Sequence, residues 1–262
     1  MNFYKLYEGD CLTILNKLEE NSVDLILQDP PYNSTSCDWE WDILTKIDEL
    51  WKEWYRVLKS DGNIVMTGSE PFSSKLRLSN IERYSYDWVW DKVKPGNIFN
   101  AETQPMRRHE NIMVFSSTGS KFNPQLVKRD KIKRSKNYGI GEAFGGEGKK
   151  ENNVYRYTHR NPTTILTYSN ANQTGKLHPT QKPVELMEYL IKTYSNKDDI
   201  ILDSFIGSGT TMIASQNLRR SCIGIEILSE YCDIIKNRCF TRRFLDREVN
   251  YDFIRKRERK TE

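Results

Sequence analysis

A glycine-rich turn between an apolar strand and a helical run constrains the fold of this chain more than any other stretch. Residues 200–202 are Ile-Ile-Leu, residues 203–211 read Asp-Ser-Phe-Ile-Gly-Ser-Gly-Thr-Thr, and residues 212–218 have helical character. This order is typical of α/β sheets that bind a nucleotide or cofactor, because glycines let the backbone pass close to a ligand. The turn has neither the third glycine of the dinucleotide fingerprint nor the lysine of a phosphate loop. The sequence therefore predicts a cofactor site of another kind.

A second strand follows this turn and also leads into an acidic residue. Residues 222–225 are Cys-Ile-Gly-Ile, and Glu226 comes directly after them. An acid about 20 residues beyond a glycine turn, at the end of the next strand, is placed to bind ribose hydroxyls. We therefore expect Glu226 to belong to the same cofactor site as the turn.

Another predicted buried strand, residues 23–27, leads into Asp29-Pro30-Pro31-Tyr32. Ligands of open α/β sheets bind at the carboxyl ends of the strands. Pro31 pushes Pro30 toward extended geometry, so the Pro30 carbonyl can be held beside the Asp29 carboxylate. Two adjacent acceptors suit an amino group with two hydrogens, and Tyr32 offers a flat face to a planar ring. On these residues alone, a strand-ending turn with a solvated aspartate is an equal alternative.

Together these stretches resemble the amino-group DNA methyltransferases that use S-adenosylmethionine. Residues 29–32 are similar to the DPPY catalytic motif of that family, and residues 203–211 to its cofactor motif DPFxGSGTT, with Ser204 where proline is common. Residues 178–183, His-Pro-Thr-Gln-Lys-Pro, resemble the motif that precedes the cofactor loop. A catalytic motif before the cofactor loop is the order of the permuted β group. The resemblance covers nearly the whole chain apart from a middle segment and the tail.

The resemblance implies a site-specific, restriction-modification type DNA methyltransferase that transfers a methyl group from S-adenosyl-L-methionine to adenine N6 of a flipped-out base. The implied catalytic residues are Asp29, Pro30, Pro31 and Tyr32. The implied cofactor-binding residues are Asp10, Cys11, Asp29, His178, Thr180, Lys182, Asp203, Phe205, Gly207, Ser208, Gly209, Thr210, Thr211, Glu226 and Ile227. An aspartate at position 10 lies against the adenine of the cofactor in the family; capping of the following helix is the alternative role, and one carboxylate can serve both. No metal is required.

The sequence leaves alternatives open for the target base and for the class of substrate. In the family, DPPY usually accompanies adenine, and Ser or Thr in place of the acid usually accompanies cytosine, so Asp29 favours adenine N6 over cytosine N4. The long basic insert and the permuted motif order disfavour an RNA or protein methyltransferase. A non-catalytic DNA-binding subunit would be expected to lose the acid or the glycines, and this chain has both.

Alternating strand-like and helix-like segments predict an α/β fold with a doubly wound, mostly parallel sheet. The resemblance implies a Rossmann-like methyltransferase fold that is circularly permuted and carries an inserted target-recognition region. We expect residues 1–117 and 176–262 to form the catalytic domain and residues 118–175 to form the insert. Within the catalytic domain, an amphipathic helix is predicted from Ile43 to Leu58, ended by Asp61-Gly62 and followed by a strand over residues 63–67.

The segment 118–175 is rich in basic residues and has little periodicity. Charge runs are commonly solvated loops, but structureless inserts of this length tend to be functional. The resemblance places target recognition here, with cations that hold phosphates or read guanine edges. The expected DNA-binding residues are Lys128, Arg129, Lys131, Lys133, Arg134 and Lys136.

Composition restricts the setting of the protein. The net charge of +4 over 262 residues does not by itself imply a nucleic-acid partner. No apolar run approaches a membrane span and the first residues are not a signal peptide, so we expect a cytoplasmic, nucleoid-associated protein. The five cysteines form no CxxC pair, which favours reduced thiols, and the three histidines are not spaced as metal ligands. A restriction endonuclease partner and a homodimer stay open, and the recognition sequence cannot be read from the chain.

Overall fold

The computed structural model describes residues 2–31, 46–136, 154–170, 181–240 and 250–255. The chain divides into two compact units, one formed by Met1–Asn123 with Thr164–Glu262 and the other by Pro124–Thr163. The smaller unit lies inside the segment 118–175 for which the sequence predicts an insert. In the described part of the chain, no helix is both long enough and apolar enough to cross a membrane.

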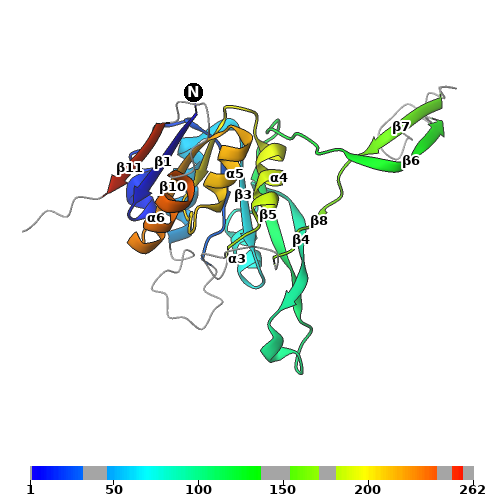
Figure 1. The fold of residues 1–262 in the computed structure, drawn as a ribbon, viewed down its shortest axis with the longest axis horizontal. Helices are drawn as coiled ribbons and strands as arrows, with labels where there is room; N and C mark the ends of the chain where they lie inside the picture. The colour runs from blue at the N-terminus through cyan, green and yellow to red at the C-terminus, as the bar shows by residue number, and fades with distance from the viewer. Residues whose placement is uncertain (1, 32–45, 137–153, 171–180, 241–249, 256–262) are drawn as a thin grey trace, which may run out of the picture. The chain divides into compact units, whose positions relative to one another are not determined.

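A nine-stranded sheet forms the centre of the larger unit, in the order β11-β1-β10-β9-β2-β3-β5-β4-β8 (Figure 1). Its strands are β1 (Phe3–Glu8), β2 (Val23–Gln28), β3 (Leu58–Gly68), β4 (Tyr84–Gly96), β5 (Arg107–Ser116), β8 (Ile165–Thr167), β9 (Ile200–Asp203), β10 (Ser221–Glu226) and β11 (Asn250–Arg255). Strand β5 runs antiparallel to β3 and β4, whereas the other neighbours pair in parallel. The predicted mostly parallel α/β sheet is confirmed.

Helices cover both faces of this sheet. The helices α1 (Cys11–Leu15), α2 (Ile47–Val57) and α3 (Phe72–Ser79) pack on one face, in a cluster that includes Ile26 of β2. Leu25 and Leu27 point the other way, because successive strand residues face opposite sides. That second face carries α4 (Val184–Tyr194), α5 (Thr210–Leu218) and α6 (Ser229–Ile235), the last continued by a π-helical turn, Lys236–Phe240.

The boundary between α2 and β3 differs from the prediction. Helix α2 ends at Val57 and β3 begins at Leu58, so Asp61-Gly62 lies within the strand rather than at the end of the helix. The pairing of β2 with β3 shifts register here, because Val23 pairs with Leu58 while Leu25 pairs with Asn63. A Cβ on Gly62 would lie 2.8 Å from the Asp24 carbonyl oxygen, so the glycine permits a close backbone approach.

The smaller unit is built on a two-stranded antiparallel sheet. Strand β6 (Val127–Lys136) pairs with β7 (Val154–Arg160), with Val127 opposite Arg160 and Lys136 opposite Val154. The register shifts between Lys128 and Lys133. The basic run predicted as an aperiodic insert is therefore strand over its described residues, because backbone pairing with a later segment of the chain does not require a hydrophobic alternation.

Candidate active site

The carboxyl edge of the sheet brings together three of the predicted site residues. Asp29 follows β2, Asp203 ends β9 and Glu226 ends β10, and these strands are neighbours in the order β10-β9-β2. Parallel strands end at a common edge, so acids far apart in the sequence meet there. Asp203 and Glu226 are buried, whereas the Asp29 side chain is partly exposed.

The Asp29 carboxylate is held at both of its oxygens. Lys182, directly before α4, places its Nζ 2.7 Å from Asp29 Oδ2. Thr67 of β3 donates its hydroxyl to Asp29 Oδ1. Pro30 is buried beside it and Pro31 is half-buried. These contacts fix the direction in which the remaining lone pairs of the carboxylate point.

Lys182 is a buried cation between two acids. Its side chain is 7% exposed, and its Nζ lies 3.4 Å from Glu110 Oε2 of β5 and 5.8 Å from the ring centroid of Trp90 on β4. Burial on its own disfavours the charged ammonium, but Asp29 and Glu110 outweigh burial and raise the pKa of Lys182 above its ordinary value. The sequence predicts Lys182 as a cofactor residue; the structure places it against the predicted catalytic acid.

Asp203 lies in a strongly negative environment. Burial, reinforced by the carboxylates of Asp29 and Glu226, raises the pKa of Asp203 to about 7 against the opposing hydrogen bonds from Thr211 and the Phe205 amide. The Phe205 N–H donates to Asp203 Oδ1 at 3.0 Å. A crowded set of carboxylates of this kind favours a positively charged ligand, because added positive charge relieves the mutual repulsion.

Glu226 joins the glycine turn to the next loop. Its Oε2 accepts from the Gly207 N–H at 2.9 Å, and its Oε1 accepts from the N–H groups of Ile227 and Leu228, each at 3.0 Å. Burial raises the pKa of Glu226 despite these bonds. Ile227 is exposed beside it, and the Gly9 N–H donates to the Glu226 carbonyl at 2.8 Å, which brings the β1–α1 turn to the same place.

The two glycines of the turn have different surroundings. Both adopt positive φ, 54° at Gly207 and 85° at Gly209. A Cβ on Gly209 would lie 3.1 Å from Cys239 Sγ, so this glycine allows the turn to pack on the helix that follows α6. Among the described residues, a Cβ on Gly207 would meet only the Phe205 carbonyl, at 4.0 Å, so these residues leave open space on that side of the turn. That space adjoins Glu226 and is available to a ligand.

The remaining residues of the turn are tied down by Arg238, which sequence reasoning did not single out. Arg238 Nη1 donates to the Ser208 carbonyl at 2.9 Å and lies 3.2 Å from Ser208 Oγ and 3.3 Å from Thr210 Oγ1. Thr210 and Thr211 are buried in the first turn of α5. These contacts give the glycine turn a fixed shape.

Asp10 caps α1, as one of its two predicted roles requires. Its Oδ1 accepts from the Thr13 N–H at 2.9 Å. The neighbouring Cys11 is half-buried, and burial, with the Asp10 carboxylate, raises the pKa of its thiol to about 11. A thiol with that pKa is protonated at neutral pH and is not a nucleophile. Three other predicted site residues, Tyr32, His178 and Thr180, lie outside the described residues.

The predicted DNA-binding cations are on β6 of the smaller unit. Lys128, Lys131 and Lys133 are exposed, and Arg129 is half-buried with its Nε donating to the His159 carbonyl at 3.1 Å. Arg134 and Lys136 belong to β6 by their backbone, while their side chains lie outside the described residues. Exposed Arg156 and Arg160 on β7 extend the basic surface; pairing of the strands, invisible in the sequence, brings them there.

Similarity to known proteins agrees with this arrangement. A family model described as DNA methylase, of the N6 and N4 type, matches residues 23–237. The chain belongs to the N6/N4 DNA methylase family. It is 33% identical over 256 residues to the type II methyltransferase M.HpaI of Haemophilus parainfluenzae, covering 94% of this chain and 75% of that protein. It is 30% identical over 259 residues to the type II methyltransferase M.HinfI of Haemophilus influenzae, covering 89% of this chain and 67% of that protein.

Solved structures share the fold at lower identity. The M1.HpyAVI–SAM complex matches with a TM-score of 0.61 and 24% identity, over 90% of this chain and all (100%) of that one. The PvuII DNA methyltransferase, described as cytosine-N4-specific, matches with a TM-score of 0.66 and 19% identity, over 95% of this chain and 89% of that one. This member of the N6/N4 family is accordingly a DNA methyltransferase that acts on an exocyclic amino group.

Sequence reasoning missed Thr67, Glu110 and Trp90 as parts of this site. Thr67 reaches Asp29 because Gln28 of β2 pairs with Met66 of β3, and that register depends on the irregular pairing at the start of β3. Glu110 and Trp90 are opposite each other on β5 and β4. The sequence does carry a signal for Glu110, an acid just before the apolar strand residues 112–115, but only the pairing connects it to Lys182.

Proposed function

We propose that this chain transfers a methyl group from S-adenosylmethionine to N6 of adenine at a specific site in DNA. The observation that carries the proposal is the Asp29 carboxylate, held by Thr67 and Lys182 at the carboxyl edge and followed directly by Pro30-Pro31. An acid in this position, rather than Ser or Thr, is what the resemblance associates with adenine.

The residues at this edge fit S-adenosylmethionine. That cofactor carries a sulfonium and an ammonium group, and the buried carboxylates of Asp203 and Glu226 lie where such charges would be stabilised. Glu226 Oε2 accepts a single backbone N–H, from Gly207, so its second lone pair can accept from a ribose hydroxyl. The described residues leave open space beside Gly207 for the ligand, and Asp10 and Cys11 lie at the start of α1, after the adjoining β1–α1 turn. When bound, this cofactor supplies an electrophilic methyl group.

The catalytic contribution of the protein is to orient a weak nucleophile. The lone pair of an exocyclic amine is delocalised into the base, so the nitrogen attacks poorly in its planar form. Asp29 and the Pro30 carbonyl accept the two amino hydrogens and favour a more tetrahedral nitrogen, whose lone pair is then directed. Positioning and preorganised acceptors are the main terms in such a reaction. No proton has to leave before attack, because the methylated ammonium is strongly acidic.

Lys182 and Thr67 act on Asp29 rather than on the base. Lys182 Nζ is buried between Asp29 and Glu110, where water does not compete for the ion pair. It therefore balances the charge of the catalytic acid. A carboxylate fixed at both oxygens needs little reorganisation when the amine arrives, which is the advantage of a preorganised site. The base must leave the duplex to reach this edge, and Tyr32 is the proposed stacking partner.

Target recognition is proposed for the smaller unit and its flanks, residues 118–175. The support is the exposed basic surface of β6, including Lys128, Lys131 and Lys133, which suits phosphate contacts. Because DNA is the proposed substrate, we also propose that the protein is cytoplasmic and nucleoid-associated and that a restriction endonuclease is its functional partner.

Cytosine N4 is the second candidate target. The acceptor pair at Asp29 and Pro30 suits either exocyclic amine, and a fold neighbour is cytosine-N4-specific. Mass spectrometry of nucleosides from methylation-free duplex DNA, treated with protein and cofactor, separates the two. We expect N6-methyladenine. N4-methylcytosine would overturn the base assignment, and methylation of RNA alone would overturn the substrate.

A further inference from the structure

Strands β4 and β5 continue past the sheet edge that carries Asp29. Strand β3 ends at Gly68, opposite Asn111 of β5. Beyond that pair β5 still pairs with β4, through Glu110 with Trp90 and then His109 with Asp91. Residues 91–109 therefore form a two-stranded ribbon that leaves the sheet at the carboxyl end of β3, and Figure 1 shows it extending beyond the ends of the neighbouring strands.

The base of this ribbon is part of the candidate active site. Trp90 and Glu110, the pair at which the ribbon begins, both contact Lys182, which in turn holds Asp29. The same strands thus line the catalytic edge and reach out from it. A substrate that binds at this edge and extends along these strands would contact the ribbon.

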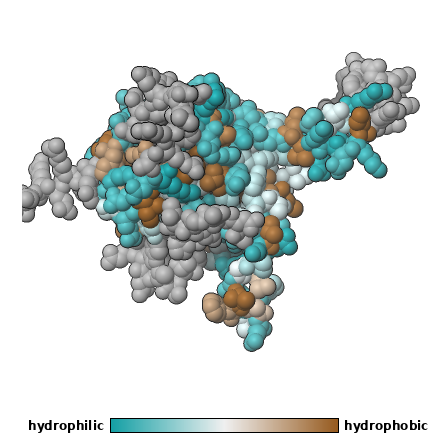
Figure 2. Space-filling view, viewed as in Figure 1, coloured by the Kyte–Doolittle hydropathy of each residue, from teal (hydrophilic) through white to brown (hydrophobic). Residues whose placement is uncertain are grey.

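The free end of the ribbon is apolar and exposed. Phe99 is 98% exposed and Ile98 is 70% exposed, in the 3₁₀ turn η2 (Ile98–Asn100). Figure 2 shows hydrophobic atoms gathered at this end. The turn is ordered by backbone hydrogen bonds, from the Ala101 N–H to the Ile98 carbonyl at 3.1 Å and from the Gln104 N–H to the Asn100 carbonyl at 3.0 Å. Exposed apolar groups on a defined turn indicate a binding surface rather than a frayed loop.

Charge next to this apolar end favours a polyanion. Asp91 is neutralised by a bidentate pair with Arg108, at 2.7 and 2.8 Å, and Lys92 pairs with Glu110 at 3.1 Å. Among the described residues, exposed Lys94 and Arg107 take part in no ion pair. The ribbon also carries one exposed acid near its tip, Glu102, but its Lys and Arg residues outnumber its Asp and Glu residues by four to two. Apolar tip residues on a positively charged ribbon match a duplex, which offers base faces between phosphates. A second copy of this chain would have to bring carboxylates to the same place.

We propose that the ribbon is a DNA wedge: Phe99 and Ile98 insert at a base step beside the flipped target, while Lys94 and Arg107 contact the flanking phosphates. The inference rests on the proposed function, because it takes DNA as the substrate. Extrusion of one base leaves its neighbours unstacked, and apolar side chains such as Phe and Ile commonly fill or open such steps. Phe99 offers an aromatic face for stacking. The ribbon begins at the catalytic edge, so it lies near the position proposed for the flipped base.

Photo-crosslinking identifies what the ribbon touches. A benzophenone amino acid is placed at position 99 of the full chain, with position 78 as the matched control, because Leu78 is 74% exposed on α3 outside the ribbon. We expect irradiation with duplex DNA to link position 99 to DNA and position 78 not to. A crosslink from position 99 to a second copy of the chain, or equal yields at the two positions, would overturn the wedge.

Kinetics test the role of the contact. Phe99→Ala should lower the rate of methylation of duplex DNA at least ~5-fold, the loss expected for one base–aromatic stack. Leu78→Ala should match the wild type, and both variants should bind S-adenosylmethionine as the wild type does. A target base opposite an abasic site, which is already unpaired, should restore much of the Phe99→Ala rate.

The outcomes also separate the two proposals. Wild-type protein that methylates DNA while Phe99→Ala retains the full rate would refute the wedge alone. Wild-type protein that methylates no DNA would refute the proposed function, and the wedge with it.

Discussion

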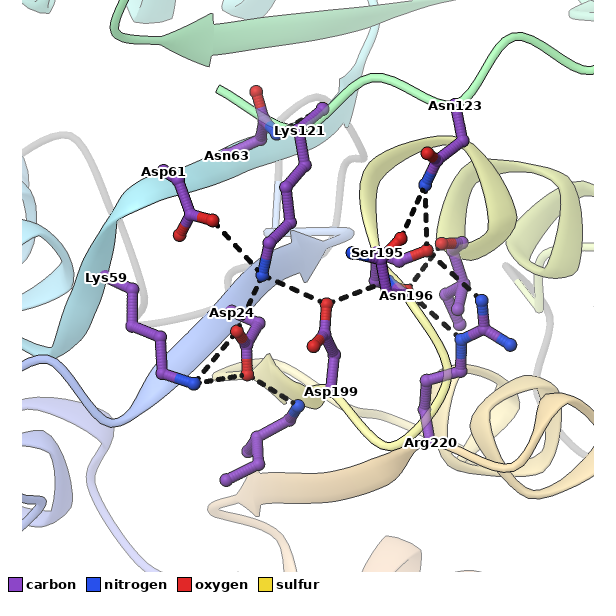
Figure 3. A network of polar contacts seen from close by, with 12 residues as sticks. Asp24, Lys59, Asp61, Asn63, Lys121, Asn123, Ser195, Asn196, Asp199 and Arg220 are labelled. Atoms are coloured by element: carbon purple, nitrogen blue, oxygen red, sulfur yellow. Dashed lines mark hydrogen bonds and ion pairs between the residues drawn. The ribbon is translucent and has the colours of Figure 1, made fainter. Parts of the chain in front are cut away.

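Strand β2 has an aspartate near each end, and the two lie in opposite electrostatic surroundings. Near the amino end, Asp24 is 2% exposed and accepts from Lys59 Nζ at 2.9 Å, from Lys121 Nζ at 2.8 Å and from the Ile200 N–H at 3.0 Å (Figure 3). Burial alone favours the neutral acid, but these hydrogen bonds and cations outweigh it and lower the pKa of Asp24. At this end the buried charge is fully paired.

At the carboxyl end, acids face one another. Asp29 has Lys182 as its cation, but Asp203 on the neighbouring strand lies between Asp29 and Glu226. Burial, together with repulsion from these two acids, raises the pKa of Asp203 to about 7. One end of the sheet thus balances its charges within the protein, and the other keeps an excess of negative charge. The comparison teaches that the first arrangement serves stability, while the second is suited to a cationic ligand.

The paired end also holds the stretch of the larger unit that ends at Asn123. Lys121 reaches Asp24, Asp199 at 3.1 Å and Asp61 at 3.5 Å (Figure 3). Asn123 donates its backbone N–H to the Thr193 carbonyl at 2.7 Å. Asn123 is the last residue of the larger unit before Pro124. The network therefore fixes where the chain leaves the larger unit.

The largest effect is expected on the free energy of unfolding when the paired acid Asp24 is removed. Asp24→Ala should lower the free energy of unfolding by about 3 kcal/mol, because Lys59 and the Ile200 N–H lose this acceptor and Lys121 loses one of its three carboxylate partners. Lys197→Ala is the matched control: both side chains of its pair with Asp198 are exposed, and its removal should cost under about 0.5 kcal/mol. Urea unfolding at neutral pH measures both. Equal losses would mean that the Asp24 network is no more stabilising than a surface pair.

At the carboxyl end, removing an acid should raise the free energy of unfolding at neutral pH rather than lower it. Folded Asp203 holds its proton up to about pH 7, above the ordinary range of the unfolded chain, so the wild-type protein without ligand loses stability as the pH rises through that window. Asp203→Asn should therefore become more stable relative to the wild type between about pH 5 and pH 8, by up to a few kcal/mol. Unfolding curves at both pH values decide this. A stability difference that does not change with pH would show that the pKa of Asp203 is not raised in the folded protein.

These contrasts show which parts of the site a sequence can predict. Asp29, Asp203 and Glu226 each follow a recognisable strand, and parallel strands bring their ends together, so their meeting could be predicted without coordinates. The partners of Asp29 could not, because Thr67 is placed by the register of β2 on β3 and that register follows an irregularity at residues 59–62. Asp61-Gly62 there looks like a helix end, since local residue preferences do not encode a close backbone approach.

The same limit applies to the basic insert. The run from Lys128 to Lys136 is recognisable by charge alone, and its strand conformation depends on pairing with residues beyond a long intervening segment. Lys182 gives a second example. Its motif is recognisable in the sequence, but its ion pairs are not, because Asp29 and Glu110 follow or belong to different strands that only the fold brings together. Long-range pairing, rather than local pattern, separates what a sequence predicts from what it does not.

Removing the other acid of the crowded end should affect the cofactor specifically. Glu226→Ala should weaken S-adenosylmethionine binding by about 1–3 kcal/mol, the usual cost of stranding buried polar partners. Here the stranded groups include the Gly207 N–H of the glycine turn. Calorimetry measures the affinity, and DNA binding without cofactor is the control that should stay constant. An unchanged cofactor dissociation constant would reduce Glu226 to a strand-ending acid.

The smallest expected effect lies outside both ends of β2. Neutralising Lys131, Lys133 and Arg134 together should weaken DNA binding and reduce its salt dependence by roughly 0.9 in slope for each phosphate that is no longer neutralised. Cofactor affinity should not change. Neutralising Lys192 and Lys197, exposed on the larger unit, provides the comparison. If both sets alter the salt slope equally, the β6 surface has no special role in DNA binding.

The most direct test of the account is single-turnover methyl transfer by Asp29→Ala and Asp24→Ala, compared at equal concentrations of folded protein. The account predicts that Asp29→Ala loses at least about 10²-fold in rate, as expected when a preorganised group is removed, while its cofactor affinity stays within several-fold of the wild type. Asp24→Ala should retain the wild-type rate despite its lower stability. Near-normal turnover by Asp29→Ala would contradict the assignment of catalysis to the carboxyl end of β2.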